Sequence, residues 1–184
     1  SYNTDIKQPS CKPCDAGQYQ PSPKAISCFK CAKGTFQMYS NMTSCELCLD
    51  GYIAAFEESI KCTICENGTK MNPNRSYCEP CQASEFQNAQ GQTICKHCPS
   101  GFINTAIGSD SCVECQKGSY AKQPNLACEP CDAGSFQDQN AKTKCEPCQD
   151  GTAQPHTGAT SCEDCQVGFF MNKNKLTCDA CPAG

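Results

Sequence analysis

The chain has 184 residues, of which 22 are Cys and none is Trp, and its formal net charge is −4. The hydrophobic share of 38% includes those cysteines, so the remaining apolar surface cannot offset the entropy of ordering one conventional core, and covalent or metal cross-links must order the chain. It has no cluster of Lys or Arg and no apolar stretch long enough for a membrane span. These absences argue against a nucleic-acid partner and against direct membrane insertion of this segment.

Residues 1–10, SYNTDIKQPS, form a polar lead-in without the apolar segment of a signal peptide. From residue 11 onward the chain is a tandem repeat, and every Cys belongs to one of eleven C-x2-C pairs that follow each other at steps of 16 or 17 residues. The first members of the pairs are Cys11, Cys28, Cys45, Cys62, Cys78, Cys95, Cys112, Cys128, Cys145, Cys162 and Cys178.

Each repeat has the same internal order. Three residues after the second Cys comes a Gly in ten copies and Ser84 in the other, and an aromatic residue follows in most copies. The Gly predicts a turn with a positive φ or a close approach of two backbone segments. We expect the aromatic side chain to be the one large apolar group that covers the cystines of its repeat. The pattern predicts a β-finger without helices: a turn, a short strand at the aromatic, a polar loop, and a second short strand into the next pair.

A period of 50 residues lies on top of the repeat, because from Cys28 the steps run 17, 17, 16 three times. Duplication of a three-repeat gene segment explains this period, and so does a helical rod or packed filament in which every third repeat meets a similar environment. If repeats touch only their neighbours, about eleven of them form an elongated, solenoid-like rod with little regular secondary structure. The expected organisation is a lead-in (1–10), a first repeat (11–27), three-repeat blocks (28–77, 78–127 and 128–177), and the start of a further repeat (178–184), as in a fragment of a longer chain.

A single stretch such as residues 128–148 would also suit a four-thiolate zinc site. Such a site uses two C-x2-C pairs and would give a period of two repeats, whereas the observed period is three. N-x-S/T sequons at Asn41, Asn67 and Asn74 indicate a secretory route, where chains dense in cystine occur. We therefore expect disulfides, no metal and no cofactor, with N-linked glycans at Asn41, Asn74 and Asn67 as the covalent modification.

The disulfide connectivity does not follow from the sequence alone. The simplest pattern compatible with an indefinite repeat joins the second Cys of one pair to the first Cys of the next. That pattern gives Cys14–Cys28, Cys31–Cys45, Cys48–Cys62, Cys65–Cys78, Cys81–Cys95, Cys98–Cys112, Cys115–Cys128, Cys131–Cys145, Cys148–Cys162 and Cys165–Cys178. Cys11 and Cys181 are left over, and we expect them to bond outside this segment.

The motif C-x2-C-x2-G-x-[FY], followed by a polar stretch and the next C-x2-C, resembles the ephrin-receptor-type cysteine-rich repeat. That repeat is similar to the modules of tumour-necrosis-factor receptors, and long arrays of it resemble protist surface proteins of the ciliate type. The resemblance extends from Cys11 to Gly184 and implies a disulfide-bonded fold that is extracellular or at the cell surface. It leaves the function open, because such repeats serve as spacers, ligand platforms and coats. Ser84 departs from the motif, as do Thr69 and Thr152 where an aromatic is usual.

No nucleophile, base and orienting group can be named, and the two His, His97 and His156, occupy non-equivalent repeat positions. We therefore expect a non-catalytic extracellular structural protein. It would be a disulfide-laddered, N-glycosylated rod that self-associates in a cell-surface coat, appendage or filament, or that continues in the same chain. The alternative is the ectodomain of a receptor or adhesin whose rod binds a protein ligand. The regular period and an expected lack of exposed apolar clusters favour the structural role.

Overall fold

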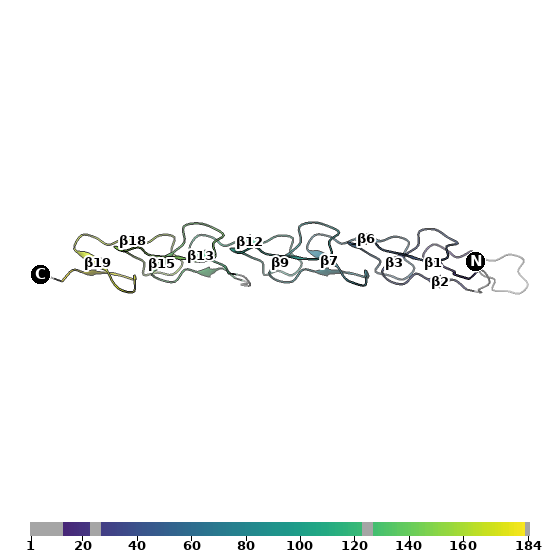
Figure 1. Ribbon diagram of the computed structural model, residues 1–184, viewed down its shortest axis with the longest axis horizontal. Helices are drawn as coiled ribbons and strands as arrows, with labels where there is room; N and C mark the ends of the chain where they lie inside the picture. The colour runs from purple at the N-terminus through teal and green to yellow at the C-terminus, as the bar shows by residue number, and fades with distance from the viewer. Residues whose placement is uncertain (1–12, 23–26, 123–126, 183–184) are drawn as a thin grey trace, which may run out of the picture. The chain divides into compact units, whose positions relative to one another are not determined.

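The computed structural model describes residues 13–22, 27–122 and 127–182. These ranges contain no helix, and their regular structure consists of strands of two or three residues (Figure 1). The strands are β1 (Gln18–Tyr19), β2 (Phe29–Lys30), β3 (Thr35–Phe36), β4 (Glu46–Leu47), β5 (Tyr52–Ile53), β6 (Thr63–Ile64), β7 (Thr69–Met71), β8 (Cys78–Pro80), β9 (Glu85–Phe86), β10 (Lys96–His97), β11 (Phe102–Ile103), β12 (Val113–Glu114), β13 (Ser119–Tyr120), β14 (Glu129–Pro130), β15 (Ser135–Phe136), β16 (Glu146–Pro147), β17 (Thr152–Ala153), β18 (Glu163–Asp164), β19 (Phe169–Met171) and β20 (Cys178–Ala180).

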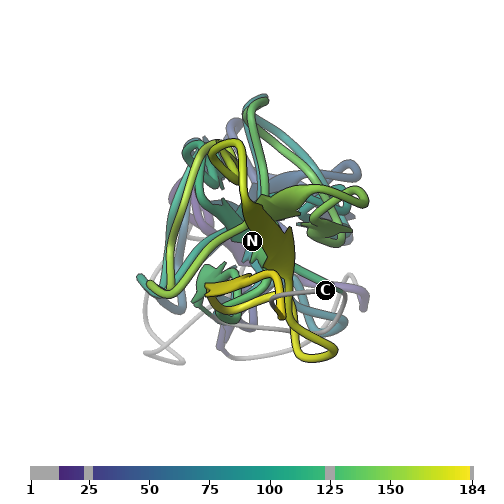
Figure 2. The same ribbon diagram turned by 90° about the vertical axis from the view of Figure 1, so that its left-hand side faces the viewer.

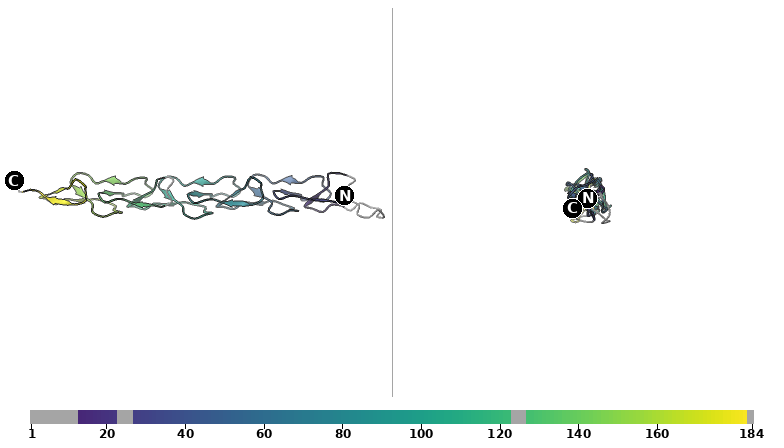
Figure 3. Two further views of the ribbon diagram at one scale, coloured as in Figure 1. Left: turned by 90° about the horizontal axis from the view of Figure 1, so that it is seen from below. Right: turned by 90° about the vertical axis from the view of Figure 1, so that its right-hand side faces the viewer.

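The residues group into two compact units. The first unit comprises Ser1–Cys81, Gln87–Lys96 and Ile107–Asp110, and the second comprises Gln82–Phe86, His97–Ala106 and Ser111–Gly184. In the first unit, antiparallel hairpins join β1 to β2, β3 to β4, β5 to β6, and β7 to β8. In the second unit, the same kind of hairpin joins β11 to β12, β13 to β14, β15 to β16, β17 to β18, and β19 to β20 (Figure 3).

Each hairpin begins just after the Gly turn and closes on the next C-x2-C pair. Its second strand is formed largely by the two residues between the cysteines, as in β1 and β2, where Tyr19 lies opposite Phe29. In two of the repeats with the 16-residue step, pairing extends to the Cys itself, with Met71 opposite Cys78 and Met171 opposite Cys178. Figure 2 shows the second of these hairpins in yellow. The shorter loop brings one more residue of each strand into register.

The core of the fold consists of cystine and small or amide side chains. The second Cys of nine successive pairs, from Cys14 to Cys148, is at most 2% exposed, and Gln37 and Gln87 are among the largest fully buried side chains. That an aromatic side chain covers the cystines of its repeat stays a prediction. Every described aromatic that follows the Gly is half-buried or exposed, and the residue after it is the buried one in several repeats.

Consecutive repeats are joined by backbone hydrogen bonds. In most repeats, the N–H of the Gly donates to the carbonyl of the residue three positions after the equivalent Gly or Ser of the next repeat, as from Gly17 to Gln37 (2.7 Å) and from Gly134 to Gln154 (2.7 Å). The N–H of the second Cys of the next pair donates to the carbonyl of that Gly, as from Cys31 to Gly17 (2.9 Å). Each repeat therefore continues the hydrogen bonding of the one before it, which is how an array with few apolar residues satisfies its backbone.

The conserved Gly also contacts the repeat after next. Gly34 has a φ of +83°, and a Cβ added to it would lie 2.3 Å from the carbonyl oxygen of Asn74. In the second unit, a Cβ added to Gly101 would lie 2.0 Å from the carbonyl oxygen of Ala141. Both roles expected of the Gly are confirmed, because it combines a positive φ with a close backbone approach. Contacts limited to adjacent repeats were expected, and that expectation was wrong.

The fold class predicted from the sequence is confirmed. The described residues form small disulfide-rich hairpin repeats, and they contain no helix long and apolar enough to cross a membrane.

Candidate functional site

The cysteines form ten disulfides in the order that the sequence analysis gave, from Cys14–Cys28 to Cys165–Cys178. Their Cα atoms lie 5.5–5.8 Å apart, and each bond closes a segment of 13 or 14 residues in sequence separation. Within the described ranges, no three His, Cys, Asp or Glu residues lie where they could hold a metal ion together. Cys181 is exposed with a free thiol, and Cys11 lies outside the described residues, so the bonding of both stays a prediction.

Buried amide side chains close the loops that connect the strands. Gln37 donates from Nε2 to the carbonyl oxygen of Ser44 (2.9 Å), and its Oε1 accepts from the N–H of Tyr39 (3.1 Å). Gln87, Gln137 and Gln154 make the same pair of bonds in their own loops. Both polar ends of the amide are satisfied, which is what allows so polar a side chain to be buried. The repeated Phe-Gln dipeptide was visible in the sequence, but polarity alone predicts an exposed Gln.

In eight of the pairs, the carbonyl oxygen of the second Cys accepts a hydrogen bond from the loop of the next repeat. The donor is a backbone N–H in most repeats, as from Asn41 to Cys14 (2.9 Å) and from Ala141 to Cys115 (2.8 Å). In the other cases a side chain takes its place. The Arg75 guanidinium donates to the carbonyl of Cys48, and the Lys175 ammonium donates to the carbonyl of Cys148.

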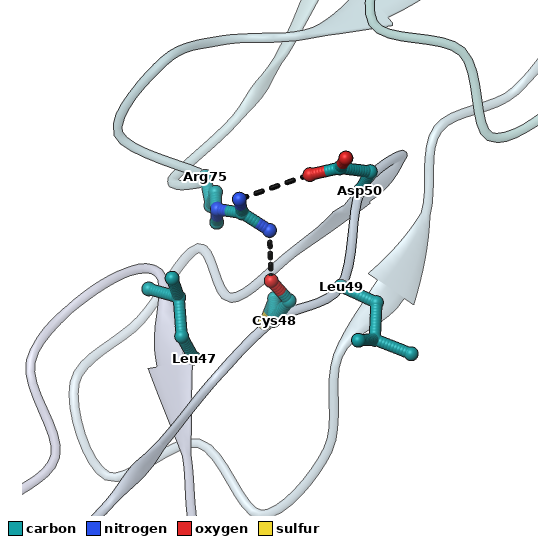
Figure 4. Close-up of a pocket in the computed structure, with 5 residues that line it drawn as sticks. All are labelled: Leu47, Cys48, Leu49, Asp50 and Arg75. Atoms are coloured by element: carbon teal, nitrogen blue, oxygen red, sulfur yellow. Dashed lines mark hydrogen bonds and ion pairs between the residues drawn. The ribbon is translucent and has the colours of Figure 1, made fainter.

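Arg75 lies beside a surface hollow lined by Leu47, Cys48, Leu49 and Asp50 (Figure 4). A second nitrogen of its guanidinium pairs with the Asp50 carboxylate at 2.9 Å. Leu47 is 58% exposed and Leu49 is 76% exposed. The hollow therefore presents two apolar side chains next to an ion pair, a combination suited to contact with another protein.

The exposed apolar side chains are concentrated in the block 28–77. The block 78–127 exposes Ile94, Ile107 and Val113, whereas the block 28–77 exposes Phe29, Met38, Tyr39, Leu47, Leu49, Tyr52, Phe56, Ile60 and Tyr77. The positions 100 residues later hold Glu129, Asp138, Gln139, Pro147, Gln149, Thr152, His156, Thr160 and Thr177, and the exposed large apolar side chains of the block 128–177 are Val167, Phe169 and Phe170. The expected lack of exposed apolar clusters stays a prediction, but the exposed apolar side chains are unevenly distributed, with most of them in the block 28–77. Comparing blocks position by position would have found this signal in the sequence.

The three sequon residues, Asn41, Asn67 and Asn74, are all exposed and all lie in this same block. Asn41 adopts a left-handed backbone with a φ of 64° in the loop closed by Gln37. Asn67 follows a buried Cys65 by two residues, and its neighbour Gly68 donates from its N–H to Gln87 (2.7 Å). The fold leaves each of the three asparagines at the surface.

Charged groups lie at the surface, and some of them are paired. Gln18 donates from Nε2 to the Glu58 carboxylate (2.7 Å), with Lys30 at 3.4 Å from the same group. The hydrogen bond from Gln18 is the main reason that the pKa of Glu58 lies below its ordinary value of 4.5, and Lys30 lowers it further. His97 and His156 are both exposed, and neither comes together with a nucleophile as an acid–base pair would.

The sequence profile of a family described as tyrosine-protein kinase ephrin type A/B receptor-like matches residues 68–115 and 118–165, just over half of the chain. No curated protein matches the chain. The repeats of this family are non-catalytic disulfide-rich modules of receptor ectodomains, which agrees with the ten disulfides and with the hairpin in each repeat. The chain therefore belongs to the ephrin type A/B receptor-like family of cysteine-rich repeats.

Proposed function

We propose that the chain is a structural segment of an extracellular protein, a disulfide-laddered and N-glycosylated rod that forms part of a cell-surface coat, appendage or filament. The observation that carries this proposal is the repetition of one set of contacts. In each unit, a repeat bonds to the next repeat and packs its Gly against the one after it, as Gly17 does with Gln37 and Glu58. Contacts of this kind continue for as long as repeats are added.

The composition of the core supports a role outside the cell. Cystine and buried amides replace apolar side chains, so the fold depends on disulfides that persist only in an oxidising compartment. Membership of the receptor-like family supports the same location. With no assembled acid–base or nucleophilic set among the described side chains, the repeats themselves are what the segment contributes, and we expect its partners to be further copies or further repeats of its own chain.

A second candidate function is the ectodomain of a receptor or adhesin that binds a protein ligand. The exposed Leu47 and Leu49, which line one hollow, favour it, because adjacent apolar side chains at the surface mark interaction sites. The hollow at Leu47, Leu49 and Arg75 would be the contact point. On the structural proposal, the same side chains contact a neighbouring copy.

Small-angle X-ray scattering and analytical ultracentrifugation of the secreted, oxidised chain test the structural proposal. We expect an elongated particle whose mass rises with concentration, with filaments visible by negative-stain microscopy. Leu47→Gln with Leu49→Gln is the matched variant, since Gln149 holds the position equivalent to Leu49, and it should weaken assembly if copies meet through the hollow. A compact particle would contradict both candidate functions, because each describes a rod. A monomer at every concentration that captures a cell-surface protein through Leu47 and Leu49 would support the receptor instead.

A further inference from the structure

Four loops of the chain share one backbone arrangement, and three of them occupy equivalent positions in the 50-residue blocks. These three loops span residues 37–44, 87–94 and 137–144, and each is closed from within by the buried Gln at its first position. The fifth residue of each loop has a positive φ, at Asn41 (64°), Gly91 (67°) and Ala141 (56°). The N–H of that residue donates to a Cys carbonyl in the preceding repeat at 2.8–2.9 Å in all three loops. Differences between the loops therefore lie in their exposed side chains.

The exposed side chains of the first loop differ from those of the other two in a correlated way. Met38 and Tyr39 are 54% and 61% exposed, and Asn41 completes a sequon with Thr43. The corresponding residues are Asn88, Ala89, Gly91 and Thr93 in the second loop, and Asp138, Gln139, Ala141 and Thr143 in the third. All three loops keep the Thr that a sequon needs, but only the first has the Asn, and only the first exposes an aromatic side chain two residues before it.

We propose that Asn41 carries an N-linked glycan and that the first sugar of this glycan packs on the ring of Tyr39. This inference rests on the extracellular location in the proposed function. The glycan would also cover the exposed apolar side chains of this loop, which the equivalent loops lack.

The modification is a group transfer with a lipid-diphosphate-linked oligosaccharide as the donor. The side-chain nitrogen Nδ2 of Asn41 bonds to the anomeric carbon of the first sugar, and the bond from that carbon to the diphosphate oxygen breaks. The amide gives up one proton, and the lipid diphosphate leaves with the electron pair. No oxidation or reduction takes place, and the Thr at the third sequon position is the residue that the transferring enzyme requires.

The chemistry of the two groups suits such a contact. One face of a pyranose ring presents polarised C–H groups, and the face of a tyrosine ring carries partial negative charge, so the two attract each other and exclude water from an apolar surface. Residues two apart lie within about 7 Å of each other along the chain, which one sugar ring spans. The loop is pinned at Gln37 and at Cys14, so little additional entropy is lost when the sugar settles on Tyr39.

The test uses the full chain secreted from eukaryotic cells and trimmed enzymatically to a single N-acetylglucosamine at each occupied site. Peptide mass spectrometry reads the occupancy of Asn41, and NMR reads the ring-current shift of the sugar protons. We expect Asn41 to be occupied, with sugar resonances shifted upfield in the natural chain and unshifted in Tyr39→Gln. In a cycle with Asn41→Gln, the sugar should raise the midpoint of thermal unfolding by about 2–4 °C more with Tyr39 than with Gln in its place.

The third loop supplies a matched control. Ala141→Asn creates a sequon with Thr143 on the same backbone, beside Gln139 in place of the aromatic. Its sugar should show no upfield shift, and adding Gln139→Tyr should produce one. An unoccupied Asn41 overturns the proposal, and so does an occupied Asn41 whose sugar signals and stabilisation are the same with Tyr39 and with Gln. None of these measurements reads assembly, so a chain that passes them yet stays monomeric contradicts the structural function alone.

Discussion

The guanidinium of Arg75 hydrogen-bonds to the carbonyl oxygen of Cys48, a contact that a backbone N–H makes at the second Cys of most other repeats. The reason lies in the short repeat. There the N–H of Arg75 is used within its own loop, on the carbonyl of Asn72 (2.9 Å). Lys175 repeats the arrangement, with its N–H on Asn172 (3.0 Å) and its ammonium on Cys148. A long basic side chain thus replaces the donor that the shorter loop no longer supplies.

Replacing Arg75 by Ala should therefore destabilise the region around Cys48 by about 1–3 kcal/mol, the usual cost of leaving a buried carbonyl without its partner. Arg75→Lys should retain most of the stability, because Lys175 occupies the equivalent position. Asp50→Asn should cost little, since the Asp50 side chain is 76% exposed and an exposed ion pair contributes little. Urea denaturation of the oxidised chain measures all three variants. Equal losses for the Lys and Ala variants would contradict this role of Arg75.

The Gly of the repeat should be the position least tolerant of substitution, and two copies separate its two roles. Gly151 has a φ of +84° and nothing within 4 Å of an added Cβ, whereas Gly34 has nearly the same φ and the Asn74 carbonyl 2.3 Å away. Gly151→Ala should cost about 1–2 kcal/mol, the penalty of a left-handed backbone. Gly34→Ala should cost clearly more, because a backbone segment must move. Equal losses in chemical denaturation would show that the contact with the repeat after next contributes nothing.

The spacing of the cysteines was enough to predict the repeat and the fold class, and the observed pairing is the simplest one compatible with an indefinite repeat. Steps of 16 or 17 residues leave the second Cys of one pair and the first Cys of the next at the two ends of one hairpin, as at Cys131 and Cys145. The Gly was predictable for the same reason, since its conformational requirement recurs in almost every copy. These features depend on residues that are close together in the sequence, so a local sequence pattern can predict them.

Contacts between repeats were harder to predict. The contact between Gly34 and Asn74 could not be predicted from the sequence, because it depends on how successive hairpins are rotated about one another. The hydrogen bond from Arg75 could not be predicted for a related reason, since its acceptor, the carbonyl of Cys48, lies in the preceding repeat. The burial of Gln37 could not be predicted, because a buried amide resembles a surface residue until both of its hydrogen-bond partners are known.

Removing the amide of Gln37 should open its loop. Gln37→Ala leaves the carbonyl of Ser44 and the N–H of Tyr39 without their partners and creates a cavity at a site that is 1% exposed. A loss of about 2–4 kcal/mol follows from these two effects. Hydrogen exchange at Tyr39 and its neighbours should accelerate, while exchange in the loop closed by Gln137 stays unchanged. Gln139→Ala, at an exposed position, is the control and should have no effect. Unchanged protection of the Tyr39 amide would refute the role of Gln37.

Single disulfides should stabilise their own repeats. Replacing Cys131 and Cys145 together by Ala removes one bond that closes a segment of 14 residues in sequence separation, and a loop of this size corresponds to about 3 kcal/mol in the chain-entropy model. Limited proteolysis should then cut between residues 131 and 145 before any other loop of the described chain. Complete reduction should unfold the protein, and a chelator should leave it folded. Loss of structure on chelation, with the fold retained in reductant, would restore the zinc interpretation.

The pairing of Glu58 with Gln18 should appear as a pH dependence. The hydrogen bond from Gln18, helped by Lys30, holds the pKa of Glu58 below its ordinary value of 4.5 in the folded chain. A carboxylate with a depressed pKa stabilises the fold fully at pH values above its unfolded pKa, and this contribution is lost as the pH falls through the folded pKa. NMR titration of the Glu58 side-chain carbonyl should give a midpoint below 4.5 that moves upward in Gln18→Ala, and moves upward less in Lys30→Ala. A midpoint at or above 4.5 in the natural chain, or the same midpoint in Gln18→Ala, would show that the first repeat is not tied to the third through this bond.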